Sequence, residues 1–328
     1  MTPEQIGQPL WHRSQERGSL LGMRIMAWFY RRVGWRVAQL LLYPVVGYFF
    51  LTDRAGRRAS LEYLQRVRAM GCDAVPEAPS LRHVFRHYFE FGITILDRLG
   101  FWLAKPEDFE LTVKGGEHLD WVAEEGRGAV ILGSHLGSFD AMRLVGALRS
   151  PINIKVLMYT EHATQINEVF RQMGEISGSS TSVGVIQAVT GSFSHVFEVK
   201  QAIDRGEAVA ILADRIHPNE IGREIEVDFL GEPARLPSGP LLLAATLGCP
   251  VITMAGIRAS SRGYDIHVER FADPVRIPRG DRPRRLQHYV QVYADSLAKL
   301  CLLAPLQWFN FYDFWAKVPQ AIDEQRAK

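Results

Sequence analysis

Hydrophobic positions recur at helical spacing through the first hundred residues of the chain. Apolar side chains repeat every three or four residues, which is the pattern of amphipathic helices. A proline-containing linker at 73–79 interrupts the pattern once. Helices are expected at about 20–30, 36–51, 54–70 and 80–101. The sequence therefore predicts a helical N-terminal region over residues 1–104.

Beyond this region the pattern changes to short apolar runs that alternate with helical stretches. Continuous apolar runs such as 129–132 and 208–212 are typical of central strands buried on both faces. Strands are expected at 109–114, 128–133, 152–158, 208–213, 225–229, 251–257 and 264–270. Helices are expected at 116–125, 138–149, 163–173, 192–205, 238–248 and 283–303. The pattern predicts an α/β fold over 105–328, with a central mixed, mostly parallel sheet that is flanked by helices. We expect this domain to form one cooperative unit with the N-terminal helices.

Residues 37–52 carry no charged side chain and are rich in Tyr and Phe. At 16 residues the segment is shorter than the ~20 residues that a helix needs to cross a bilayer. Arg36 and Arg54 flank it, as is typical of a segment that lies in the membrane interface. We interpret it as an interfacial or re-entrant segment, with a buried helix or a single span as alternatives.

Composition narrows the classes of protein. An apolar fraction of 47% with 23% charged residues is typical of a globular protein, and a net charge of +2 argues against a nucleic-acid partner. Arginine is concentrated at 1–36 and at 276–285, which favours an anionic lipid surface for the first cluster and an acidic carrier protein or phosphorylated donor for the second. Solvated surface is the alternative for both. Three cysteines without zinc spacing indicate a reduced, cytosol-facing protein.

A histidine follows the strand expected at 128–133. Active sites of α/β sheets lie at the carboxyl ends of the strands, so His135 stands where a catalytic residue is expected. The small residues Ser134 and Gly137 surround it. A structural histidine is the alternative interpretation.

Asp140 lies five residues after His135, in the first turn of the helix that Ser138 can cap. A carboxylate near a helix N-terminus stays ionised. It can hold one imidazole nitrogen and make the other nitrogen a better base. The spacing therefore suggests a base that removes a proton from a hydroxyl or an amine.

Three segments resemble motifs of the bacterial lipid A late acyltransferases and, more broadly, of the His-x4-Asp glycerolipid acyltransferases. The first is Gly-Ser-His-Leu-Gly-Ser-Phe-Asp at 133–140. The second runs from the apolar strand that ends in Asp214 through Phe-Leu-Gly-Glu-Pro-Ala to Ser-Gly-Pro at 238–240. The third is the Gln-Trp segment at 305–315. The resemblance covers residues 18–316.

The resemblance implies transfer of a fatty acyl group from a thioester of acyl carrier protein or coenzyme A to a membrane lipid or its precursor. It places the protein on the cytoplasmic face of the bacterial inner membrane. His135 would be the general base and Asp140 its orienting residue. A thioester is already activated, so no metal or other cofactor is required. The substrate-binding residues would be Asp214, Arg215, Arg171, Ser134, Gly137 and Ser138.

The chain departs from the family at one place. Lipid A acyltransferases carry an arginine in the segment that corresponds to 156–161, and this chain has none there. Lipid A is therefore a doubtful acceptor. Residues 17–19 and 43–52 look more like the branch encoded in aryl polyene clusters. A non-catalytic acyl-lipid-binding protein and a thioesterase-like hydrolase remain alternatives.

Two further histidines, His83 and His87, are four residues apart on an expected helix, a spacing that some zinc sites use. Val84 follows His83, so the His-Glu-x-x-His pattern is absent. We therefore interpret both histidines as structural.

Overall fold

A computed structural model describes residues 34–103, 109–149, 152–159, 185–188, 194–216 and 222–316, together with Trp28, Tyr30 and Arg32. Within this part of the chain the N-terminal helices are α2 (Trp35–Thr52), α3 (Arg54–Ala69) and α4 (Leu81–Leu103). They lie within two residues of the expected bounds. The helix expected at about 20–30 falls largely outside the described residues, and that at 163–173 entirely.

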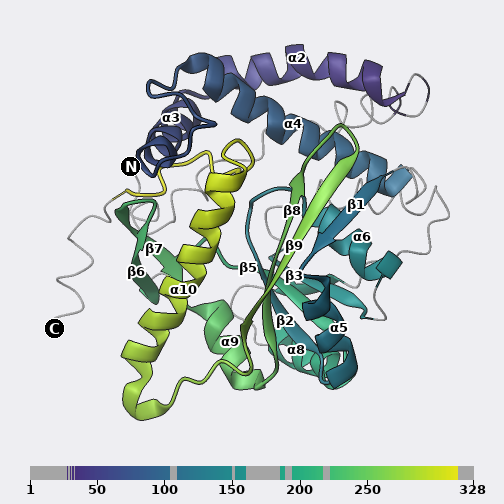
Figure 1. Cartoon of the computed structure of the whole chain (residues 1–328), viewed down its shortest axis with the longest axis vertical. Helices are drawn as coiled ribbons and strands as arrows, with labels where there is room; N and C mark the ends of the chain where they lie inside the picture. Colours follow the sequence, from purple (N-terminus) through teal and green to yellow (C-terminus); the bar gives the residue numbers. More distant parts are fainter. Residues whose placement is uncertain are drawn as a thin grey trace.

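Helix α2 continues through Pro44, which therefore does not divide the segment. The side chain of Asp53 accepts a hydrogen bond from the backbone N–H of Gly56 and caps the start of α3. Helix α2 packs along α4 at one end of the molecule (Figure 1).

The rest of the chain forms a seven-stranded mixed sheet in the order β1-β9-β8-β2-β5-β3-β4. Strands β8, β2, β5, β3 and β4 are mutually parallel, whereas β9 and β1 run in the opposite direction. The strand bounds are β1 (Glu110–Lys114), β2 (Ala129–Gly133), β3 (Ile154–Tyr159), β4 (Val185–Ala188), β5 (Ala208–Leu212), β8 (Val251–Arg258) and β9 (Gly263–Ala272). The expected mixed, mostly parallel sheet is confirmed.

Helices cover both faces of this sheet. Their bounds are α5 (Gly116–Glu125), α6 (Phe139–Arg149), α8 (Ser194–Asp204), α9 (Gly239–Leu247) and α10 (Arg282–Leu303), with a short 3-10 helix η6 (Arg279–Asp281). Alternate residues of β2 are buried on opposite faces of the sheet. Ile131 lies in the core beside α5 and α6, whereas Val130 and Leu132 lie in the core beside α8, α9 and α10. Such burial on both faces explains why β2 is an unbroken apolar run.

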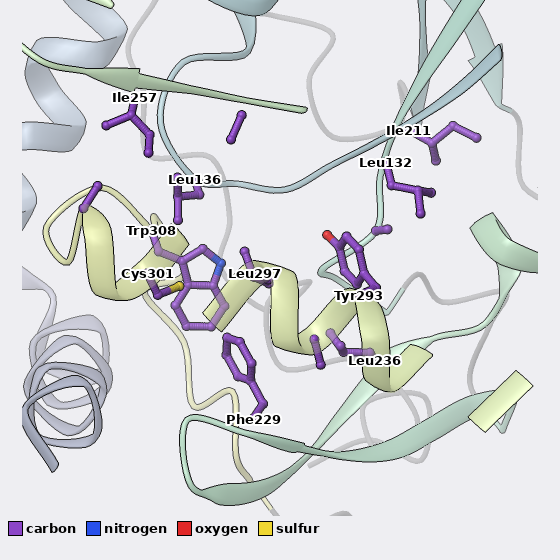
Figure 2. Close-up of a cluster of buried hydrophobic side chains, with 14 of the residues drawn as sticks. Leu132, Leu136, Ile211, Phe229, Leu236, Ile257, Tyr293, Leu297, Cys301 and Trp308 are labelled. Carbon is purple, nitrogen blue, oxygen red and sulfur yellow. The ribbon is translucent and has the colours of Figure 1, made fainter. Parts of the chain in front are cut away.

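The core on the α10 side extends into the N-terminal helices. Trp308 and Leu136 belong to it together with residues of α10 such as Tyr293 and Leu297 (Figure 2). Side chains of α2, α3 and α4, among them Leu42, are part of the same buried cluster. The helical region and the sheet therefore share one hydrophobic core.

Two strands were not predicted, β4 and β7 (Glu232–Pro237). Strand β7 pairs with β6 (Glu224–Phe229) in a separate antiparallel hairpin, so the strand expected at 225–229 does not join the main sheet. Leu230 and Gly231 form the turn with φ of 52° and 82°. Both values lie in the left-handed region that a tight hairpin of this kind requires. The hairpin packs on α10.

Candidate active site

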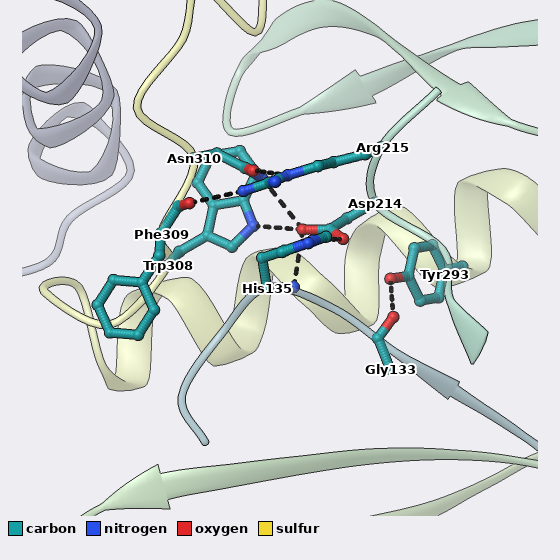
Figure 3. Close-up of polar contacts among 8 residues, drawn as sticks. All are labelled: Gly133, His135, Asp214, Arg215, Tyr293, Trp308, Phe309 and Asn310. Carbon is teal, nitrogen blue, oxygen red and sulfur yellow. Dashed lines mark hydrogen bonds and ion pairs between the residues drawn. The ribbon is translucent and has the colours of Figure 1, made fainter. Parts of the chain in front are cut away.

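The site begins where two neighbouring strands end. Strands β2 and β5 pair in parallel with Gly133 opposite Leu212, so both chains leave the sheet at the same edge. His135 follows β2 and Asp214 follows β5. The Nδ1 atom of His135 lies 2.7 Å from Oδ1 of Asp214 (Figure 3).

The carboxylate of Asp214 is fully buried and accepts hydrogen bonds at both oxygens. Its Oδ2 accepts from the backbone N–H of His135 at 3.0 Å, from Nε1 of Trp308 at 3.0 Å and from Nδ2 of Asn310 at 3.1 Å. Burial alone would raise the pKa of this carboxyl, but the charge and hydrogen bonds of His135 and the charge of Arg215 lower the pKa below its usual range. Asp214 is therefore an ionised, fixed acceptor.

Because an ionised carboxylate can only accept, the Nδ1 atom of His135 must carry the hydrogen that faces it. The Nε2 atom of the neutral ring then carries the lone pair. Burial and the nearby guanidinium of Arg215 lower the pKa of His135, and the charge of Asp214 only partly offsets them. The side chain of His135 is 27% exposed. The imidazole of His135 is therefore neutral near pH 7 and partly exposed.

Asp140 lies elsewhere. Its Oδ2 is 2.9 Å from Nε of Arg98 on α4, and its Oδ1 is 4.0 Å from Nε of Arg143 on α6. Spacing along the chain predicts that Asp140 contacts the imidazole of His135. In the structure Asp214 makes this contact instead. The physical reason is that Asp140 belongs to the first turn of α6, which packs on α4, whereas Asp214 directly follows β5, the strand next to β2.

The small residues near His135 shape the turn into α6. The Oγ atom of Ser138 accepts from the backbone N–H of Ala141 at 3.2 Å, which is the expected cap. Gly137 has φ of 70°, and a Cβ there would overlap the carbonyl oxygen of Gly256. Ser134 is buried directly after β2.

Arg215 is half-buried beside the site and is held by the C-terminal segment. Its Nε donates to Oδ1 of Asn310 at 2.7 Å, and its Nη2 donates to the carbonyl oxygen of Phe309 at 2.9 Å. The guanidinium also lies over the ring of Tyr312, 5.9 Å from the centroid. Arg171 lies outside the described residues.

Sequence reasoning did not assign a polar role to the segment 307–310, which closes the site. The backbone N–H of Phe309 donates to the carbonyl oxygen of His135 at 2.8 Å, and that of Gly137 donates to the carbonyl oxygen of Gln307 at 2.8 Å. The side-chain amide of Gln307 accepts from the backbone N–H of Arg258 and donates to its carbonyl oxygen, at 2.9 Å each. It thus replaces the backbone partner that a neighbouring strand would provide. The Gln-Trp motif was the signal, but its spacing alone does not indicate these partners.

Two other histidines, His87 and His83, have only local or structural partners among the described residues. His87 is fully buried between Oγ of Ser60 at 2.8 Å and the carbonyl oxygen of Trp308 at 2.9 Å. Burial lowers its pKa to about 4, so its ring is neutral near pH 7. His83 lies near the start of α4, where its Nδ1 accepts from the backbone N–H of Ser80 at 3.1 Å. These contacts agree with the structural interpretation of both histidines.

A buried carboxyl ties α2 to the rest of the fold. Asp97 on α4 accepts from Nε1 of Trp35 at 2.7 Å and from the hydroxyl of Tyr264 at 2.6 Å. Burial raises the pKa of Asp97 to about 6, although both hydrogen bonds act in the opposite direction. The contact joins α2, α4 and β9 at one point.

The arginine cluster at 276–285 lies near the end of the sheet at which β2 begins, whereas His135 follows the other end of β2. Asp273, just before the cluster, accepts from Nη2 of Arg127, which precedes β2. Helix α10 starts in the cluster and runs toward the site, where the hydroxyl of Tyr293 donates to the carbonyl oxygen of Gly133 at 2.7 Å. The cluster and His135 therefore lie near opposite ends of the strands.

Comparison with known proteins identifies one family. The family model described as bacterial lipid A biosynthesis acyltransferase matches residues 81–316. This range contains α4, the whole sheet and the segment that closes the site. None of the curated proteins matches the chain.

Proposed function

Because the chain belongs to the bacterial lipid A biosynthesis acyltransferase family, we propose that it transfers a fatty acyl group from a thioester of acyl carrier protein or coenzyme A to a membrane lipid or lipid precursor. The acceptor group is a hydroxyl or an amine. The observation that carries this proposal is the hydrogen bond between His135 and the buried, ionised Asp214. It leaves a neutral imidazole with its lone pair on Nε2, which is what the activation of such an acceptor requires.

In the proposed reaction Nε2 of His135 takes the proton of the acceptor as the acceptor oxygen or nitrogen attacks the thioester carbonyl. A carbon–oxygen or carbon–nitrogen bond forms and the carbon–sulfur bond breaks. The imidazolium then gives its proton to the departing thiolate. Asp214 stabilises the imidazolium, since its charge lies 2.7 Å from Nδ1.

We propose an acceptor other than lipid A, of the kind made by aryl polyene clusters. The support is the absence of arginine from 156–161, together with the sequence of residues 17–19 and 43–52. Comparing lipids from cells with and without the protein by mass spectrometry tests this. Loss of one acylated species identifies the acceptor and the acyl chain, and loss of acylated lipid A would contradict the proposal.

The role of His135 is tested by replacing it. His135→Ala is expected to abolish acyl transfer to extracted membrane lipids without changing the melting temperature by more than a few degrees. His288→Ala, which removes an exposed imidazole on α10, is the matched control and should retain activity. Retained transfer in His135→Ala would contradict the mechanism. Thioester cleavage at full rate without any acceptor would indicate a hydrolase instead.

We propose that the protein works at the cytoplasmic surface of the bacterial inner membrane and contacts it through α2. Among the described residues there is no helix long and apolar enough to span a bilayer. Helix α2 nevertheless exposes five large apolar side chains: Leu40, Tyr43, Val45, Tyr48 and Leu51. Large apolar side chains exposed along one helix are typical of a segment that lies in the membrane interface, and the exposed Arg36 and Arg54 at its ends suit anionic head groups.

The membrane contact is tested with anionic phospholipid vesicles. Leu40 and Leu51 are 65% and 73% exposed, and burying one leucine side chain contributes roughly 1.5–3 kcal/mol. Replacing both with serine is therefore expected to weaken co-sedimentation at least about tenfold. Phe197→Ser, which removes a 70% exposed aromatic ring on α8, is the control and should bind as the parent does. Equal binding by the parent, the double serine variant and Phe197→Ser would contradict the proposal that α2 contacts the membrane.

A further inference from the structure

We propose that Asn310 is a positioning residue whose side-chain amide keeps the guanidinium of Arg215 away from Asp214, so that the carboxylate remains directed at His135. The inference rests on the proposed function, in which His135 is the base. Asn310 does not touch the reacting atoms. It acts through the two charged groups on either side of it (Figure 3).

The orientation of the amide is determined by its partners. Arg215 can only donate, so it must face the amide oxygen, and its Nε lies 2.7 Å from Oδ1 of Asn310. Ionised Asp214 can only accept, so it must face the amide nitrogen, and Nδ2 of Asn310 lies 3.1 Å from its Oδ2. The amide is 2% exposed and thus forms a buried bridge between a cation and an anion.

A half-buried guanidinium and a buried carboxylate attract each other strongly when nothing separates them. A direct bidentate pair would engage the oxygen of Asp214 that His135 now uses, because the geometry of the guanidinium matches both carboxylate oxygens. The Asn310 amide occupies the space in which that pair would form. Arg215 is also held by the carbonyl oxygen of Phe309, which keeps it on the far side of the amide.

Among the residues that the structure describes, the other titratable groups that face the site carry no charge near pH 7. Burial raises the pKa of Tyr293 on α10 and that of Tyr312 on the C-terminal segment above the usual range. Burial also raises the pKa of Cys301, whereas it lowers that of His87 to about 4. Within this part of the chain, Arg215 and Asp214 are therefore the charges that decide the protonation of His135.

Two substitutions at Asn310 are expected to shift the pKa of His135 in opposite directions. In Asn310→Ala the spacer is gone, Arg215 moves onto Asp214, and the neutralised carboxylate no longer supports the imidazolium. The pKa of His135 then falls, by about one unit, which is the effect of one nearby charge. In Asn310→Asp the new carboxylate takes Arg215 and adds negative charge, so the pKa of His135 rises by a similar amount.

The experiment is an NMR titration of the histidine rings in the isotope-labelled full chain, with the His135 signal assigned from its absence in His135→Gln. Asn153→Ala is the matched control, since it removes an amide that donates to Glu207 at 3.3 Å far from the site. It should leave the His135 titration unchanged. A backbone amide spectrum of each variant establishes that it is folded, and Asn310→Asp keeps the shape of the parent side chain. An unchanged or raised pKa in Asn310→Ala overturns the proposal.

A double replacement tests the path of the effect. If Asn310 acts through Arg215, adding Asn310→Ala to Arg215→Gln leaves the pKa of His135 where Arg215→Gln alone puts it. A further shift of half a unit or more in the double variant would contradict that path. The titration needs no substrate, so the proposal about Asn310 fails or stands independently of acyl transfer by the enzyme.

Discussion

Replacing Asp214 with asparagine is expected to leave the fold intact and switch the imidazole to the wrong tautomer. Three donors meet at Oδ2 of Asp214: the backbone N–H of His135, Nε1 of Trp308 and Nδ2 of Asn310. In Asp214→Asn the amide oxygen must occupy the position of Oδ2, because an NH2 group cannot accept hydrogen bonds from these three donors. The amide nitrogen then faces Nδ1 of His135 and donates to it. The hydrogen of the ring moves to Nε2, where the base is needed.

The size of the effect follows from these contacts. Turning the amide around would sacrifice three hydrogen bonds, each worth about 1 kcal/mol, so the inactive tautomer is favoured by about 3 kcal/mol or more. The substitution also removes the charge that stabilises the imidazolium. An equivalent change in the serine proteases lowers kcat by roughly 10⁴-fold. We therefore expect a loss of about 10³- to 10⁴-fold in Asp214→Asn.

The measurement is thiol release from an acyl thioester in the presence of extracted membrane lipids, together with the ¹⁵N shifts of His135, which distinguish the two tautomers. Asp140→Asn is the informative comparison. It alters the contacts with Arg98 and Arg143 but does not touch the imidazole, so it should keep the parent tautomer. If Asp140→Asn switched the tautomer and Asp214→Asn retained more than a tenth of the activity, Asp140 would be the orienting residue and our reasoning would be refuted.

Three further outcomes are expected. The pKa of Asp97 in the folded protein is raised from 3.8 to about 6, so its protonated form contributes stability that is lost as the pH rises between these values. In denaturant titrations, Asp97→Asn should therefore raise the free energy of unfolding at pH 7.5 by up to about 3 kcal/mol. The same variant should flatten the pH dependence of the free energy of unfolding between about pH 4 and 6. Gly137→Ala should lower both the melting temperature and the activity, because its Cβ would overlap the carbonyl oxygen of Gly256. Since one buried cluster joins the helices to the sheet, residues 1–104 and 105–328 should unfold in a single transition, and two calorimetric peaks would contradict this.

Periodicity was sufficient to predict the layers of this fold. Long amphipathic helices such as α4 and apolar central strands such as β2 and β5 have a strong local signal, since burial requires a regular pattern. Strand β7 was missed because Pro233 and Pro237 lie in it and its pairing depends on a turn with two left-handed residues. Pairing across a hairpin is not a local property, so single-strand patterns do not reveal it.

The position of His135 at the end of a central strand was predictable, but its hydrogen-bonding partner was not. His135 follows a central strand, and the rule that sites lie at carboxyl ends of strands identified it. The choice between Asp140 and Asp214 depends on strand order, because β5 pairs directly with β2. Spacing along the chain favours the nearer carboxylate, whereas the sheet brings the distant one into contact. The roles of Trp308 and Asn310 depend on the same long-range packing.

The closing segment has a consequence for how the enzyme is made. His135 and Asp214 are synthesised well before Gln307, Trp308 and Asn310, whose contacts complete the site. A nascent chain that ends before this segment has a histidine and a carboxylate without the donors that hold them in register. Such a chain lacks the contacts that hold His135 and Asp214 in place, so we expect it to be inactive while the helices are still folding. Activity is therefore expected only from chains in which translation has passed residue 310.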